Sequence, residues 1–175
     1  MIINLSEIMS VKGQVKNIQA PFELKSITYS GMECLVERSS QVDLTVSHTG
    51  ERKVEIEGET EVDLLISCNR CLGAVKVPFK INFFEKLDFN LEDEDAVNKL
   101  KEINYVNEYD LDLDLLVQNA IILDFPMKVL CSNDCKGLCN SCGTNLNKDL
   151  CNCESTSLDP RMAAIQDIFN EFKEV

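Results

Sequence analysis

The chain has 175 residues, 45% of them hydrophobic, and carries a formal net charge of −13 at pH 7. The apolar fraction excludes a disordered chain and is sufficient for the core of one domain, with or without a small appendage. With 17 basic against 30 acidic side chains, nonspecific binding to duplex nucleic acid is disfavoured, because it normally requires a basic face.

No apolar run approaches the roughly 20 residues that a bilayer-spanning helix needs. Residues 1–13 lack the basic start, the long apolar core and the cleavage site of a signal peptide. We therefore expect a cytoplasmic protein with no membrane partner. In that reducing compartment the nine cysteines are expected to be metal ligands in preference to disulfides.

Residues 21–89 show the alternation that is typical of β-strands. The apolar members of the successive stretches are Val42, Leu44 and Val46; Val54 and Ile56; Val62, Leu64 and Ile66; and Val75, Val77, Phe79, Ile81 and Phe83. Thr49-Gly50 and Gly58 are expected to form turns of an antiparallel meander. Pro78 lies inside the last stretch and predicts an edge strand or a bulge there.

Residues 90–108 are acidic and weakly patterned, and we expect a loop or mobile insertion. The acidic excess peaks between Glu85 and Asp114, with the run Glu92-Asp93-Glu94-Asp95 at its centre. Such a run is typical of a solvated loop. Alternatively, it provides an acidic surface that attracts a basic protein.

Two helices are expected in the second half of the chain. The first carries residues at helical spacing and ends before Pro126: Leu111, Leu115, Leu116, Asn119 and Ile122. The second begins at Pro160, is capped by Asp159, and has one apolar stripe: Met162, Ile165, Ile168, Phe169 and Phe172.

These elements predict an α+β fold, with a mostly antiparallel β-sheet or partly closed barrel followed by helices and a C-terminal zinc-ribbon-like cysteine segment. Residues 1–130 would form an antiparallel β-rich domain with the acidic loop and one helix. Residues 131–175 would form the cysteine-rich zinc segment and the C-terminal helix, packed on the first part.

The segment Cys139-Asn140-Ser141-Cys142-Gly143 has the spacing of a zinc knuckle, in which two thiolates reach one ion at about 2.3 Å. Gly143 permits a positive φ that directs backbone N–H groups toward the sulfurs. With Cys151 and Cys153, the knuckle pair makes a four-thiolate zinc ribbon. In the alternative set, Cys131 and Cys135 replace the closely spaced pair Cys151 and Cys153 as ligands.

The remaining paired cysteines predict a second zinc site. Cys68 with Cys71 and Cys131 with Cys135 make a complete four-thiolate set that joins the sheet to the C-terminal segment, and Cys34 is left as a buried small hydrophobe. In the alternative, one zinc is bound, Cys131 and Cys135 are spare thiols, and Cys68 and Cys71 are packed inside the fold or weakly redox-active. Thioredoxin-like chemistry is disfavoured, because Cys68 and Cys71 lie between two strand candidates and not at a helix N-terminus.

Little in the sequence favours an enzyme or a small-molecule substrate. A catalytic zinc keeps an open position, usually with a histidine or carboxylate nearby. The single histidine, His48, is expected on the surface of a hairpin, far in sequence from the cysteine cluster. Arg70, Lys76 and Lys80 could form a small basic spot near the first cysteine pair, although three charges are ordinary for a surface.

Four motifs occur in order along the chain: Ser67-Cys68-Asn69-Arg70-Cys71-Leu72, Leu123-Asp124-Phe125-Pro126-Met127, residues 135–143 with Asn145-Leu146-Asn147, and Asp159-Pro160-Arg161. This set resembles the YceD family, the large ribosomal RNA subunit accumulation proteins, over nearly the whole chain. The resemblance implies a bacterial or plastid factor needed for accumulation of 23S ribosomal RNA. Some relatives lack the C-terminal cysteine cluster, which implies that zinc there stabilises the fold.

Counterion release from phosphates cannot supply the affinity of so acidic a protein for RNA. We therefore expect a noncatalytic factor for large ribosomal subunit biogenesis, with a basic ribosomal protein or assembly factor as partner and any RNA contact being local. Two alternatives remain open: a zinc-dependent or thiol redox enzyme, and a nucleic-acid-binding zinc ribbon.

Overall fold

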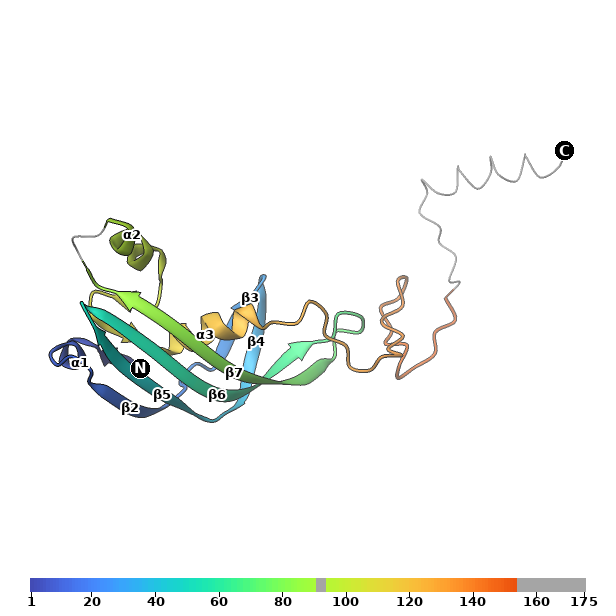
Figure 1. Cartoon of the computed structure of the whole chain (residues 1–175). Helices are drawn as coiled ribbons and strands as arrows, with labels where there is room; N and C mark the ends of the chain where they lie inside the picture. Colours follow the sequence, from blue (N-terminus) through green and yellow to red (C-terminus); the bar gives the residue numbers. More distant parts are fainter. Residues whose placement is uncertain (91–93, 154–175) are drawn as a thin grey trace.

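Figure 1 shows the computed structural model, which describes residues 1–90 and 94–153. The larger of its two sheets has six strands: β2 (Val15–Pro21), β3 (Ser26–Tyr29), β4 (Met32–Ser39), β5 (Gln41–Gly50), β6 (Lys53–Ser67) and β7 (Ala74–Asp88). The smaller sheet has the order β1 (Ile2–Asn4), β9 (Asp110–Asp112), β8 (Val106–Asn107). The helices are α1 (Ser6–Met9), α2 (Glu94–Glu102) and α3 (Leu113–Leu123).

The long strand β6 organises the larger sheet. One of its edges pairs with β7 over the whole length of β6, from Lys53 opposite Asp88 to Ser67 opposite Ala74. The other edge pairs first with β5 and then with β4. Every strand pairing in the described part of the chain is antiparallel. The predicted α+β class with a mostly antiparallel sheet is confirmed.

The larger sheet is open, so the alternative of a partly closed barrel was wrong. Among the described strands, β7 pairs with β6 alone. This arrangement makes β7 an edge strand, as Pro78 predicted, because an edge tolerates a residue that has no N–H to donate. Pro78 lies opposite Asp63 in the register.

The two predicted glycine turns had different outcomes. The hairpin between β5 and β6 does turn at Gly50, and the next two residues, Glu51 and Arg52, have positive φ values of 54° and 62°, as a type I′ turn requires. Gly58, in contrast, lies inside β6 and is buried. The two stretches around Gly58 therefore belong to one strand of 15 residues.

The predicted alternation places most apolar side chains of β5, β6 and β7 on one face of the sheet, where they are buried, although Val75 and Val77 at the start of β7 are only half-buried. Helix α3 covers part of this face and contacts β7. The chain beyond α3 adds Phe125, which stacks on Tyr29 with ring centroids 4.0 Å apart. Cys34 is buried in the same core, as predicted.

The helices differ from the predictions in three respects. The acidic segment, expected to be a loop, contains α2, and the described residues before position 131 hold three helices where one was expected. Asp112 caps α3 by accepting from two backbone N–H groups, so Leu111 precedes the helix, which ends before Pro126 as predicted. Residues 91–93 and the predicted helix from Pro160 lie outside the described residues.

His48 is buried, with 7% of its surface exposed, so its expected surface position was wrong. It continues the inward alternation of β5, and its Nδ1 lies 2.9 Å from the carbonyl oxygen of Val11. The imidazole therefore belongs to the buried face of the larger sheet. None of the helices in the described ranges has the length and apolar character needed to cross a bilayer.

Candidate metal centres

The turn between β6 and β7 carries Cys68 and Cys71. It is closed by two backbone hydrogen bonds, from the N–H of Cys68 to the carbonyl of Gly73 (2.8 Å) and from the N–H of Leu72 to the carbonyl of Cys68 (3.0 Å). Leu72 has a φ of +57°. The N–H of Arg70 also points at the Cys68 sulfur, at 3.4 Å.

The segment after Cys139 repeats this turn. The N–H of Cys139 donates to the carbonyl of Thr144 (2.8 Å), and the N–H of Gly143 donates to the carbonyl of Cys139 (2.9 Å). Gly143 has a φ of +73°, as its place after Cys142 predicted. Two separate pieces of chain thus form the same knuckle, with the residue after the second cysteine in the left-handed region.

The first quartet consists of Cys68, Cys71, Cys131 and Cys135, whose sulfurs all lie within 4.8 Å of one another. The Sγ atoms of Cys68 and Cys135 are 3.8 Å apart, and those of Cys71 and Cys131 are 3.6 Å apart. Four zinc–sulfur bonds of about 2.3 Å in tetrahedral geometry place the sulfurs about 3.8 Å from one another. Three of the four cysteines are buried, and the apolar residues packed against them are Val75, Leu130 and Leu138.

The polar side chains of the first knuckle hold the C-terminal segment against the β6–β7 turn. The N–H of Asn69 donates to the carbonyl of Val129 (2.9 Å), and the N–H of Val129 donates to Oδ1 of Asn69 (2.7 Å). Arg70 donates from Nη1 to the carbonyl of Cys135 at 2.8 Å. Gly137 has a positive φ, and a Cβ there would lie 3.1 Å from the carbonyl oxygen of Arg70.

The second quartet consists of Cys139, Cys142, Cys151 and Cys153, whose sulfurs also lie within 4.8 Å of one another. It differs from the first in being built by 15 consecutive residues, 139–153, and in being more exposed. Figure 1 shows this segment beyond the β6–β7 turn, away from the larger sheet. None of the nine cysteines forms a disulfide.

Hydrogen bonds favour the thiolate form at one cysteine of each quartet in particular. Backbone N–H groups of Cys71 and Arg70 lower the pKa of Cys68 to about 6. The hydroxyl and the backbone N–H of Thr144 lower the pKa of Cys142 to about 6, and the hydroxyl oxygen lies 3.1 Å from the sulfur.

In each quartet, one sulfur in contact with such thiolates ionises less readily. Contact with the sulfurs of Cys135 and Cys71 raises the pKa of Cys131 to about 12, and contact with Cys142 raises that of Cys153 to about 12. Four negative sulfurs at these distances would repel one another strongly unless a cation lay between them. The donor set, the spacing and this charge pattern all fit a bound metal ion.

The structure therefore brings together both predicted sets of four cysteines. The possible basic spot is reduced, in contrast, because its two lysines pair with acidic side chains in the described structure. Lys76 pairs with Glu37 (2.8 Å) and Asp63 (3.0 Å), and Lys80 pairs with Glu61 (3.0 Å). Arg70 is used in the clamp on Cys135.

One residue of the metal region had no predicted role. Asn147 lies between two ligands of the second quartet, yet its Nδ2 is 3.3 Å from the sulfur of Cys135 in the first. The motif Asn145-Leu146-Asn147 marks its position in the sequence, but nothing in the local pattern indicates which sulfur the amide reaches.

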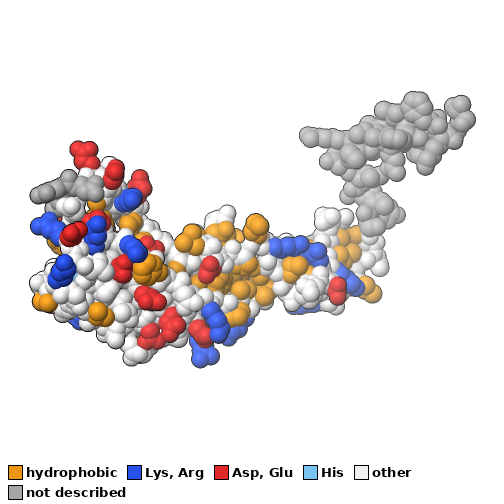
Figure 2. Space-filling view, in the orientation of Figure 1, with side chains coloured by type: hydrophobic (Ala, Val, Ile, Leu, Met, Phe, Trp, Pro, Cys, Tyr) orange, Lys and Arg blue, Asp and Glu red, His pale blue; other side chains and the backbone are white. Residues whose placement is uncertain are grey.

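A second feature lies on the exposed face of the larger sheet, where β6 carries five carboxylates at alternate positions: Glu55, Glu57, Glu59, Glu61 and Asp63. We call this row the acidic ladder. Its outer members pair with lysines of β7: Lys86 with Glu55 at 2.9 Å, Lys80 with Glu61 and Lys76 with Asp63 at 3.0 Å. Figure 2 shows acidic side chains gathered over the strands of this sheet.

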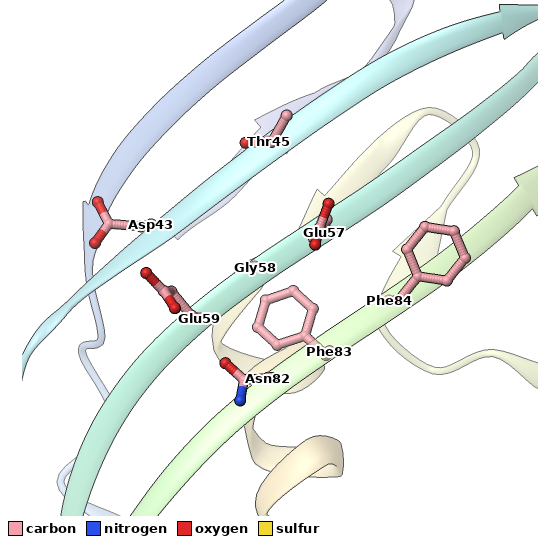
Figure 3. A pocket seen from close by; sticks show the side chains of 8 residues that line it. All are labelled: Asp43, Thr45, Glu57, Gly58, Glu59, Asn82, Phe83 and Phe84. Carbon is pink, nitrogen blue, oxygen red and sulfur yellow. The ribbon is translucent and has the colours of Figure 1, made fainter.

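The middle of the acidic ladder lacks such cations. Glu57 lies opposite Phe84 and Glu59 opposite Asn82, and neither carboxylate forms an ion pair within the described residues. With Asp43 of β5 they line a hollow of about 460 Å³. Figure 3 shows the three carboxylates on neighbouring strands, beside Asn82 and the aromatic ring of Phe84.

The predicted acidic run lies elsewhere. Glu92 and Asp93 fall outside the described residues, and Glu94 and Asp95 form the first turn of α2. The acidic surface that the structure describes in detail is the ladder on β6.

Comparison with known proteins places these features in a family. The family model described as "Large ribosomal RNA subunit accumulation protein YceD" matches residues 56–169, more than half of the chain. The match starts within β6 and includes both quartets. No solved structure matches the chain.

Among curated proteins, uncharacterized proteins of Mycobacterium bovis and Mycobacterium tuberculosis (strain H37Rv) are each 25% identical over 152 residues. Each alignment covers 83% of this chain and 73% of the relative. An uncharacterized protein of Mycobacterium leprae is 26% identical over 105 residues, covering 60% of this chain and 48% of the relative.

Proposed function

The chain belongs to the YceD family of large ribosomal RNA subunit accumulation proteins, and we propose that it is a noncatalytic factor for accumulation of 23S ribosomal RNA. It holds two structural zinc ions and acts through a basic protein of the assembling subunit. The observation that carries the zinc part is the pair of four-cysteine quartets, each built around the same knuckle.

Zinc is favoured over other metals by the ligands. Four thiolates in tetrahedral arrangement are typical of structural zinc, whereas calcium and magnesium prefer oxygen. Each quartet supplies four protein ligands, so neither leaves the open coordination position that a catalytic zinc requires. The first zinc would fasten the chain after α3 to the β6–β7 turn. The second would fold the segment 139–153, which has little core of its own.

Metal analysis of the purified protein tests this assignment. We expect two zinc ions per chain, with one lost in Cys71→Ser and one in Cys142→Ser. Cys34→Ala serves as the matched control, because Cys34 is a buried cysteine outside both quartets, and it should retain both ions. One zinc in the unmodified protein, or a chain that keeps both ions in Cys71→Ser, would contradict the two-site assignment.

The basic partner is supported by the middle of the acidic ladder. Asp43, Glu57 and Glu59 present three carboxylates in one hollow without a cation from the described chain. Phe84, which is 54% exposed, offers a ring face to a cation, and Lys86 already lies 5.2 Å from its centroid. A lysine or arginine side chain of a partner would thus contact the three carboxylates and also an aromatic ring.

Photo-crosslinking in cells tests the partner. A benzoyl-phenylalanine at Phe84 enlarges an aromatic side chain that is already exposed, so the fold should be kept. We expect crosslinks from this position to a basic protein of the large subunit. The control places the same group at Met127, which is fully exposed and lies outside the hollow. Crosslinks to ribosomal RNA from Phe84, or the same protein captured from both positions, would contradict the proposed docking surface.

A further inference from the structure

The two quartets are joined by a hydrogen bond from a residue that belongs to the second. Asn147 lies between Cys142 and Cys151, inside the loop that the second quartet closes. Its Nδ2 nevertheless donates to the sulfur of Cys135, a member of the first quartet, at 3.3 Å. Asn147 is therefore an outer hydrogen-bond partner of the first quartet, supplied by the chain of the second.

The orientation of the Asn147 amide is fixed from both ends. Its Oδ1 accepts from the backbone N–H of Lys136 at 2.8 Å, so the nitrogen is directed to the sulfur. Its Nδ2 and its backbone N–H both donate to Oδ1 of Asn145, at 2.9 and 3.0 Å. The geometry leaves the amide one role toward Cys135, which is to donate.

The backbone around Asn147 is held to the link between the quartets, residues 136–138. The N–H of Leu146 donates to the carbonyl of Gly137 at 3.0 Å, and Asn145 forms a bridge with Leu138. The loop that carries Asn147 thus packs on the three residues that connect Cys135 to Cys139. Folding of the loop in the second quartet is therefore coupled to the conformation of residues 136–138.

We propose that the two metal centres bind cooperatively, because the second centre orders the loop that places Asn147 on the Cys135 sulfur of the first. This inference rests on the two zinc sites of the proposed function. When the second centre is empty, the loop between Cys142 and Cys151 loses its closure, and ordering Asn147 then costs conformational entropy. By linkage, each metal must raise the affinity of the other centre by the same factor.

The size of the effect follows from the role of outer partners at metal sites. Loss of a hydrogen bond to a metal ligand typically lowers metal affinity about 10- to 100-fold. We expect the first centre to lose affinity in that range when the second centre is removed, and the second to lose affinity by the same factor when the first is removed.

Cadmium titration with a competing chelator, followed by cadmium-113 NMR, resolves the two centres as separate resonances. The variants needed are the full chain with Cys142→Ser and Cys151→Ser, the chain with Asn147→Ala, and the chain with all three substitutions. We expect the pair of serines to weaken the first centre about 10- to 100-fold. Asn147→Ala should weaken it similarly, and adding the serines to Asn147→Ala should cause little further loss.

Asn140→Ala is the matched control, because Asn140 is an exposed asparagine between two ligands of the second quartet. It should leave the first centre unchanged. Asn147→Asp keeps the acceptor for Lys136 and removes the donor to Cys135, so it should weaken the first centre even where the loop stays folded. Two cadmium ions that bind with independent affinities would overturn the coupling alone. A chain that binds one ion would overturn the two zinc sites as well.

Discussion

Gly58 of β6 lies directly opposite Phe83 of β7, and the Phe83 ring occupies the space that a side chain at Gly58 would need. A Cβ at Gly58 would lie 2.4 Å from Cζ of Phe83 and 3.1 Å from the carbonyl oxygen of Asp43. Because Phe83 is buried in the core, its ring cannot move aside freely. Gly58→Ala should therefore destabilise the fold by about 1–3 kcal/mol in urea unfolding, as overpacking does.

A double-mutant cycle separates overpacking from a general effect of the substitution. Phe83→Leu removes the atoms nearest to the new Cβ, so the cost of Gly58→Ala should be smaller in the Phe83→Leu background than in the unmodified chain. Additive costs for Gly58→Ala and Phe83→Leu would show that the ring is not what excludes a side chain at Gly58.

Gly58 also shows which part of the fold sequence alone can predict. The alternation of apolar residues predicted the strands correctly, because burial of one sheet face imposes that period directly. The meaning of Gly58 depended on Phe83, a residue 25 positions further along, and a glycine in an alternating stretch indicates a turn or a close cross-strand contact equally well. Helix α2 was missed because its sequence is acidic and largely exposed.

For the candidate metal centres, the sequence predicted the ligands but not the contacts that hold the two segments together. Cysteine spacing indicated both quartets, since two thiolates on one tight turn must be near each other. Arg70 donates to the carbonyl of Cys135, and Asn147 donates to the sulfur of the same residue. These contacts join residues that are distant in the sequence or lie in different turns. Such contacts depend on how the segments dock, and no local pattern specifies that docking.

The two knuckles place different residues in the same backbone conformation. Leu72 has a φ of +57° and Gly143 a φ of +73°, and a left-handed conformation costs a residue with a side chain about 1–2 kcal/mol relative to glycine. A Cβ at Gly143 would meet nothing within 4 Å, so Gly143→Ala isolates this backbone cost. We expect it to weaken metal binding at the second centre at least about fivefold.

The opposite substitution at the first knuckle is the matched test. Leu72 is 67% exposed, and asparagine tolerates the left-handed region better than leucine does. Leu72→Asn should hold or strengthen the first centre, measured by competition with a chelator. A loss there equal to that of Gly143→Ala at the second centre would show that the backbone argument does not apply.

Thr144 should set the pH at which the second centre releases its metal. Its hydroxyl and backbone N–H lower the pKa of Cys142 to about 6, so protons displace a metal from this sulfur only as the pH falls through a lower range than for an ordinary thiol. Thr144→Val removes the hydroxyl and raises that pKa. In protein loaded with cobalt, the sulfur-to-cobalt charge-transfer absorbance reports the bound metal. During acid titration of Thr144→Val, metal release should therefore begin at a higher pH than in the unmodified protein.

Thr144→Ser is the control for this titration, because it keeps the hydroxyl and loses only a methyl group. Its release curve should follow that of the unmodified protein, and the first centre should be unaffected in both variants. A Thr144→Val curve that coincides with the Thr144→Ser curve would show that the hydroxyl does not support the Cys142 thiolate.

The acidic ladder should attract a basic protein and not RNA. The chain carries a net charge of −13 and so displaces few counterions from RNA. Isolated 23S ribosomal RNA should therefore bind weakly, with an affinity that changes little with salt. A basic protein partner should instead bind less tightly as salt rises, because exposed charges are screened beyond about 10 Å at 0.1 M. Tight RNA binding with a steep salt dependence would contradict a basic protein partner and show that the chain binds RNA directly.

Two charge-matched variants locate that attraction on the sheet. Glu57→Gln with Glu59→Gln removes two carboxylates that no cation of the described chain neutralises, whereas Glu55→Gln with Glu61→Gln removes two that already pair with Lys86 and Lys80. Both variants change the net charge equally and on the same strand. The first should slow association with the basic partner more than the second, measured by stopped-flow at low salt, because unpaired charges contribute most to steering. Equal slowing by both would mean that overall charge, and not the hollow between Asp43 and Phe84, attracts the partner.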